Sequence, residues 1–186
     1  MALLVGTLLF VRAGTAGAAE AADGETPDTV RLGGFVQGGL QLGAAPGQSS
    51  VMPGIFVRGG PTYGVLHAAA DLMFAIGPSV GRGFAVMAGA FGSLGLHTPA
   101  LGTLTPFADL HLGPMFFHRE GPGQTDASGL WGGVSVGVAG YDRVGSSAGA
   151  FLAATAFTPL SKPERNTGDV ASLVVPLFLR GGVSLR

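Results

Sequence analysis

Apolar and mixed residues alternate with a period of two along most of the chain from residue 30 onward. This period places successive side chains on opposite faces of a β-strand, whereas a helix repeats its apolar positions every three or four residues. The alternation predicts eight strands, with turn-forming residues between them. The predicted strands cover residues 30–43, 51–59, 63–76, 82–97, 104–119, 130–143, 147–157 and 170–185.

Each predicted strand has one uncharged face and one mixed face. In the strand 104–119, for example, Leu110 and Leu112 share one face while Asp109 and His111 share the other. Strands of about 9 to 11 residues cross a bilayer when tilted, and most of the predicted strands are longer than that. A sheet that faces lipid must close, because its unpaired edge groups find no water. The pattern therefore predicts an all-β fold, an eight-stranded antiparallel transmembrane β-barrel built as an up-and-down meander.

The composition excludes several other classes of protein. Charged residues make up 11% of the chain, against about 25% in a typical soluble domain. Ten Lys and Arg stand against eleven Asp and Glu, so the basic surplus that nucleic-acid binding requires is missing. Cysteine is absent, which removes disulfides and thiolate metal sites. We expect no nucleic-acid partner, no metal and no cofactor.

The first 29 residues differ from the rest and predict an export signal. Residues 2–11 form an apolar run that is too short for a transmembrane helix, and Ala16-Gly17-Ala18 matches the pattern that signal peptidase cleaves. We therefore expect a signal peptide at residues 1–18, a short polar leader at 19–29, and the barrel at 30–186. A chain with such a signal is exported through the inner membrane.

Longer and shorter connections alternate between the predicted strands. The longer set is 44–50, 77–81, 120–129 and 159–169, and the shorter set is 60–62, 98–103 and 144–146, with one exception: 77–81 is slightly shorter than 98–103. In outer-membrane barrels, longer loops face outward and short turns face the periplasm. The polar stretches 120–126 and 162–166 are accordingly expected in outer loops.

Across residues 30–186, the strand rhythm resembles the small eight-stranded outer-membrane barrels of Gram-negative envelopes, the OmpA/OmpX type. The resemblance is architectural and includes no catalytic motif. It implies a porin-like transmembrane barrel in the outer membrane, surrounded by outer-membrane lipid and inserted by the barrel-assembly machinery. It also implies a structural, adhesive or surface-interaction role through the outer loops toward an extracellular partner, and no enzyme activity.

Charged and polar side chains on the mixed faces would point into the barrel. The interior of an eight-stranded barrel is just wide enough for side chains to fill it. Because buried charges must be paired and hydrogen-bonded, we predict a polar network that fills the lumen. Its expected members are Arg31, Arg58, His67, Asp71, Asp109, His111 and Arg180.

Two other functions stay open at this point. If the turn 98–103 places Ser93 opposite Asp109, then Ser93, His111 and Asp109 come together as candidate catalytic residues of a lipid-modifying hydrolase. The second alternative is a soluble, lipocalin-like barrel that binds an apolar ligand. It requires the opposite arrangement, with the uncharged faces inside and the charges outside.

Overall fold

The computed structural model describes most of the chain beyond residue 31. The described residues are 32–44, 51–78, 83–98, 101, 103–120, 125–141, 147–160, 164–165 and 176–186. The predicted signal peptide (1–18) and polar leader (19–29) lie outside them. No helix among the described residues is long and apolar enough to cross a membrane.

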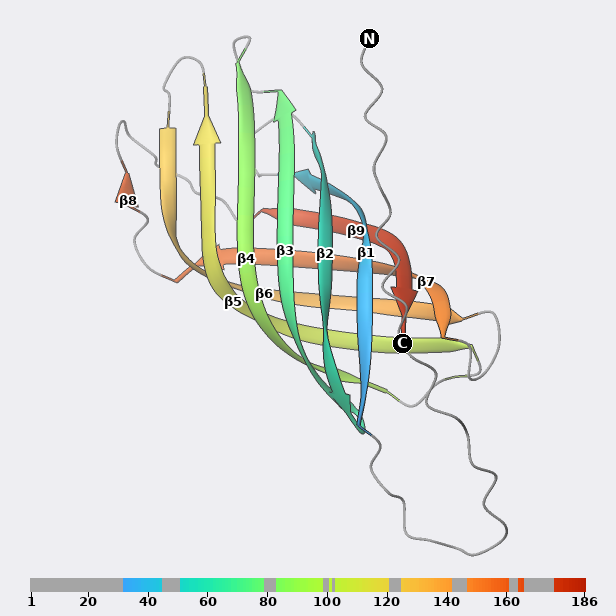
Figure 1. The fold of residues 1–186 in the computed structure, drawn as a ribbon. Coiled ribbons are helices and arrows are strands. Elements are labelled where there is room, and N and C mark those ends of the chain that lie inside the picture. Colours follow the sequence, from blue (N-terminus) through green and yellow to red (C-terminus); the bar gives the residue numbers. More distant parts are fainter. Residues whose placement is uncertain are drawn as a thin grey trace, which may run out of the picture.

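The described residues form nine β-strands. These are β1 (Leu32–Ala44), β2 (Val51–Tyr63), β3 (Leu66–Pro78), β4 (Phe84–His97), β5 (Leu104–Arg119), β6 (Thr125–Tyr141), β7 (Ala148–Pro159), β8 (Glu164–Arg165) and β9 (Leu177–Leu185). Figure 1 shows β1 to β3 lying along one common axis with alternating directions, β7 and β9 lying across them, and β4 to β6 bending from the one orientation into the other.

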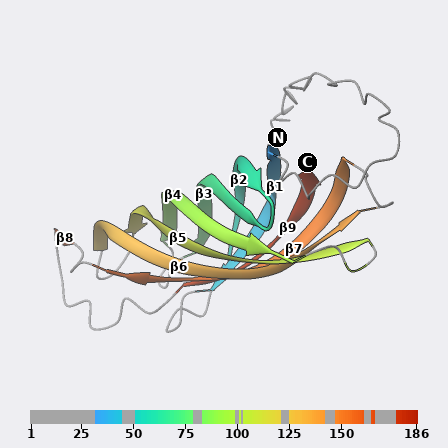
Figure 2. The same cartoon turned by 90° about the horizontal axis from the view of Figure 1, so that it is seen from below.

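Eight of these strands close into an antiparallel barrel. Strands adjacent in sequence pair from β1 to β7, then β7 pairs with β9 and β9 pairs with β1. The short β8 adds to β6, where it pairs with Ala127 and Ser128. Seen from below, the strands wrap around a common interior (Figure 2). The predicted all-β fold, an eight-stranded up-and-down barrel, is confirmed.

The second strand extends further than the sequence pattern indicated. We expected it to end at residue 59, but β2 continues to Tyr63, and the turn consists of Gly64 and Val65. Pro61 suggested a break because it has no N–H to donate. The strand continues through it, and the registered β2–β3 pairs omit Pro61 and its neighbour Gly60.

The predicted outer loops are also shorter than expected. Strand β6 begins at Thr125 instead of residue 130, where it pairs with Arg119. The hydrophobic pattern does not reveal its first residues. The outward residues Asp126 and Ser128 are polar, and the inward residue between them, Ala127, is small. In the stretch 162–166, the two residues of β8 are strand as well.

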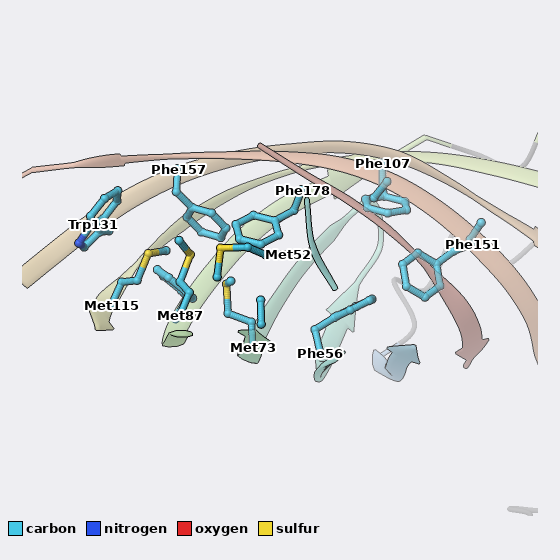
Figure 3. Packing of buried hydrophobic residues seen from close by; sticks show 14 of the residues in the cluster. Met52, Phe56, Met73, Met87, Phe107, Met115, Trp131, Phe151, Phe157 and Phe178 are labelled. Atoms are coloured by element: carbon cyan, nitrogen blue, oxygen red, sulfur yellow. The ribbon is translucent and has the colours of Figure 1, made fainter. Parts of the chain in front are cut away.

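The two faces of the strands follow the predicted alternation. Buried methionines of β2 to β5 face Phe157 of β7 and Phe178 of β9 in the interior (Figure 3), and Phe91 stacks on Phe157 with ring centroids 4.6 Å apart. Aliphatic side chains cover the outside, and the six described members of the predicted network lie inside. This arrangement is the opposite of what the lipocalin-like alternative requires, so that alternative is wrong.

The turn between β2 and β3 gives a first testable prediction. Gly64 has φ 59°, in the left-handed region that side chains with a Cβ enter at a cost. We expect Gly64→Ala to lower the free energy of unfolding by about 1 kcal/mol, and Gly64→Asn to lower it less, because Asn tolerates this region. Urea unfolding of the barrel in micelles measures both. Equal losses for Ala and Asn would contradict a φ-dependent cost.

Candidate functional site

A first polar cluster, the Asp109 cluster, consists of Arg58, His67 and Asp109. Arg58 donates from Nη1 to Asp109 Oδ2 at 2.6 Å and from Nη2 to Oδ1 at 3.0 Å. His67 Nε2 contacts Oδ1 of the same carboxylate. Arg58 lies on β2 and Asp109 on β5, which are not neighbours in the barrel. This charge-assisted, bidentate pair therefore spans the lumen.

The second group, the Asp71 cluster, consists of Asp71, His111 and Arg180. Arg180 donates from Nη1 to Asp71 Oδ2 at 2.7 Å and from Nε to Gln41 Oε1 at 3.2 Å. His111 Nδ1 lies 3.5 Å from the same carboxylate oxygen. These three residues come from β3, β5 and β9, so this cluster also crosses the lumen. All members of both clusters are buried.

Aromatic rings cover the two arginine side chains. The guanidinium carbon of Arg180 lies 4.8 Å from the ring centroid of Phe56. That of Arg58 lies between two rings, 5.2 Å from Phe35 and 5.6 Å from Phe107. Such contacts are attractive, and they are stronger where water is excluded. The rings pack against both guanidinium groups and restrict their orientation.

A glycine makes the contact between His67 and Asp109 possible. Gly95 of β4 lies between them, because it pairs with His67 on one side and with Asp109 on the other. A Cβ at Gly95 would collide with both the carboxylate and the imidazole ring. Since real Cβ atoms do not approach that closely, the Asp109 cluster requires glycine at this position.

The structure does not assemble the predicted catalytic set. Ser93 pairs with His111 in the β4–β5 ladder and Gly95 pairs with Asp109, so the expectation that Ser93 lies opposite Asp109 is wrong by two residues. The ladder continues past the end of β4, where the N–H of Thr98 donates to the carbonyl of Pro106, and this shifts the centre of the hairpin. The Ser93 hydroxyl donates to the carbonyl of Ala69 at 3.4 Å.

His111 has a different serine partner from the predicted one. Its Nε2 lies 2.6 Å from the hydroxyl of Ser135, which in turn lies 2.8 Å from the hydroxyl of Thr155. Ser135, Thr155 and Gln41 are not among the residues predicted from the sequence. All three belong to inward faces of the alternation, so choosing every inward polar residue would have found them.

The predicted network members thus divide into two clusters of three. Arg31 is the seventh predicted member and lies outside the described residues. Each cluster contains one arginine, one carboxylate and one histidine, so the arginine and carboxylate charges balance within it. In the described part of the chain, no group of three or more His, Cys, Asp or Glu side chains could hold a metal ion.

The fold is a closed ring of eight strands with aliphatic side chains outside and paired charges inside. This is the architecture of the eight-stranded outer-membrane barrels. The fold is similar to that in the crystal structure of Neisserial surface protein A, with a TM-score of 0.61 and 13% sequence identity. The alignment covers 83% of this chain and 98% of that one. No protein-family model and no curated protein sequence matches the chain.

The cross-lumen ion pair gives a second prediction. Asp109→Leu leaves Arg58 buried without its carboxylate, which lowers the free energy of unfolding by about 3–5 kcal/mol, and Arg58→Met leaves Asp109 without its guanidinium. The double variant Arg58→Met with Asp109→Leu removes both charges, and we expect it to recover most of that loss. Denaturant unfolding of the wild type, both single variants and the double variant measures the coupling. Additive losses would show that the two side chains do not stabilise each other.

Proposed function

We propose that the chain is an integral outer-membrane protein, exported through the inner membrane, that takes part in interactions at the cell surface. The observation that carries the proposal is the outward face of the barrel. Leu40, Leu94 and Leu110 are 71%, 69% and 65% exposed, and many other outward Leu, Val and Ile side chains are similarly uncovered. Water tolerates single apolar side chains but not a continuous belt of them, whereas lipid favours such a belt.

Polar and aromatic residues indicate where this apolar belt ends. At the end of the barrel where β4 and β6 begin and β5 ends, exposed Phe84 lies against His118, with ring centroids 5.6 Å apart. His118 Nδ1 is 2.5 Å from Asp126 Oδ1, and both side chains are partly exposed on the outward face. At the opposite end of the barrel, Tyr63 is exposed. Aromatic girdles at both interfaces are typical of transmembrane barrels, which supports a membrane-spanning orientation.

The lengths of the connections suggest which end faces outward. The two-residue turn at Gly64 and the connections 98–103 and 142–147 lie at one end, and 45–50, 79–83, 120–124 and 160–176 lie at the other. The Gly64 turn has two residues and the connection 160–176, which includes β8, has 17, whereas the other five connections have five or six residues. Outer-membrane barrels place short turns in the periplasm and longer loops outside, so the orientation rests on these two connections. The proposal therefore assigns contact with an extracellular partner to the second set. Outer-membrane lipid and the barrel-assembly machinery would be its partners in the envelope.

The closed lumen favours a surface role over transport or catalysis. Both ion-pair clusters and their covering rings occupy the interior, so the described residues leave no wide passage through it. A lipid hydrolase requires a serine that an acyl ester can reach, yet Ser93 and Ser135 are 4% and 2% exposed. Lipid hydrolysis that disappears in a folded His111→Ala variant would contradict this proposal and support the hydrolase alternative.

Gel migration and circular dichroism test the class of protein. The full chain, extracted from membranes and folded in detergent, should give a β-sheet spectrum and migrate differently before and after boiling, because a closed barrel resists detergent until it is heated. A protein that is soluble and folded without detergent would contradict the membrane proposal.

A pair of arginine substitutions tests which surface contacts lipid. Leu110 lies on the outward face in the middle part of β5, and Thr158 is exposed near the outer end of β7. We expect Leu110→Arg to lower the free energy of unfolding in lipid vesicles by about 2–4 kcal/mol, and Thr158→Arg by about 0–1 kcal/mol, because charge is costly near the bilayer midplane. Equal effects at the two positions would argue against a depth-dependent lipid environment.

A further inference from the structure

A cavity of about 120 Å³ lies in the lumen at the end of the barrel where β1 begins and β9 ends. It adjoins the Asp109 cluster, since Arg58 and His67 belong to its lining. A water molecule needs roughly 10–15 Å³ in a comparable measure. The cavity therefore has room for a group larger than a single water.

Three residues of the cavity lining each have a buried polar atom without a hydrogen-bond partner within the described residues. The atoms are Nε of Arg58, Oγ1 of Thr105 and Oε1 of Gln37. A buried polar atom without a partner is costly, and most such atoms in folded proteins are satisfied. The first is a charged donor, the second donates or accepts, and the third only accepts. A bound group that both accepts and donates hydrogen bonds would satisfy all three.

Around the cavity, side chains that can carry positive charge outnumber carboxylates even though Asp109 balances the charge of Arg58, which favours an anion. The described residues of its lining include Arg58, Arg186, His67 and His97, and no Asp or Glu. Asp109 lies behind this wall, where it accepts from Nη1 and Nη2 of Arg58. Two of the five N–H groups of that guanidinium bond to Asp109, and Nε is its nitrogen without a partner.

The protein fixes these groups before any ligand arrives. The two rings beside Arg58, Phe35 and Phe107, also line the cavity. Gln37 donates its amide N–H to the hydroxyl of Ser184 at 3.2 Å. Its amide carbonyl is therefore held in place with an unused acceptor. Preorganised polar groups lose little entropy when a ligand binds.

We propose that this cavity binds a small oxyanion that carries a proton, of which hydrogen phosphate is the simplest member. Arg58 Nε and the hydroxyl of Thr105 donate to its unprotonated oxygens, and the carbonyl of Gln37 accepts from its P–OH group. The imidazole of His97 lies in the lining beside these groups, stacked on His67 with ring centroids 5.8 Å apart. The site goes beyond the proposed surface function and does not depend on it.

Isothermal titration of inorganic phosphate into the full chain, folded in detergent, tests the proposal. We expect one phosphate per barrel for the wild type. Thr105→Val should bind it about tenfold more weakly, which is a typical loss for one hydrogen bond to a charged group. Because the Thr105 hydroxyl has no protein partner, this variant keeps every described hydrogen bond and should fold normally.

Thr155→Val is the matched control, since Thr155 is a buried lumen threonine outside the cavity lining. It loses the hydrogen bond to Ser135, so its thermal stability should fall while its phosphate affinity stays unchanged. Equal phosphate affinities of the wild type and Thr105→Val would overturn the assigned contact. The absence of phosphate binding to the folded wild type would overturn the site and leave water as its occupant.

Two further anions test the role of Gln37 and the source of the ligand. Sulfate and dimethyl phosphate have no proton to donate at neutral pH, and dimethyl phosphate resembles the diester of a phospholipid headgroup. We expect both to bind at least about tenfold more weakly than hydrogen phosphate, because the Gln37 carbonyl then faces an oxygen without a proton. If dimethyl phosphate binds as tightly as hydrogen phosphate, a lipid headgroup becomes the favoured source and the contact with Gln37 is overturned.

Discussion

The pairing of β1 with β9 is the interaction on which the rest of the structure depends. It runs from Val36 opposite Leu185 to Ala44 opposite Leu177 and joins the two ends of the sheet. Without it, both strands would present a row of unpaired N–H and C=O groups. In lipid such an edge has no hydrogen-bond partner, so an open sheet of these strands would be unstable there. Closure also converts the two faces of the sheet into an inside and an outside.

Closure with eight strands explains why charges meet across the lumen. The interior is narrow, so a long side chain on one strand reaches the opposite wall. Arg58 binds Asp109 from β2 to β5, and Arg180 binds Asp71 from β9 to β3. A shift of any of these strands by one residue would turn its charged side chain toward the aliphatic outer face. The two ion pairs therefore oppose changes in strand register as well as holding opposite walls together.

The sequence predicts the faces of the strands well, because the side-chain period of two is a local property. It predicts the ends of strands less well. Pro61 is a residue type that usually ends a strand, yet β2 continues past it, and the first residues of β6 have no apolar alternation. It does not predict the ion-pair partners. Arg58 lies directly opposite Asp71 in the β2–β3 ladder, and adjacency along the sheet would select that pair. Each residue instead binds a partner across the lumen, which depends on how the whole ring closes.

The interior changes in character from one end of the barrel to the other. Met87, Met115 and Trp131 lie toward the outer ends of β4, β5 and β6, in an apolar layer that continues to the Asp71 cluster. The Asp109 cluster and its cavity lie toward the end with the Gly64 turn. An ion that entered from the outer end would lose its hydration while crossing the apolar layer, and no charge there would compensate for that loss. A ligand of the cavity therefore has to come from the end with the Gly64 turn, which the proposed orientation places in the periplasm. Under that orientation, the apolar layer separates the Asp109 cluster from the outer end of the barrel, and the polar part of the lumen lies on the periplasmic side.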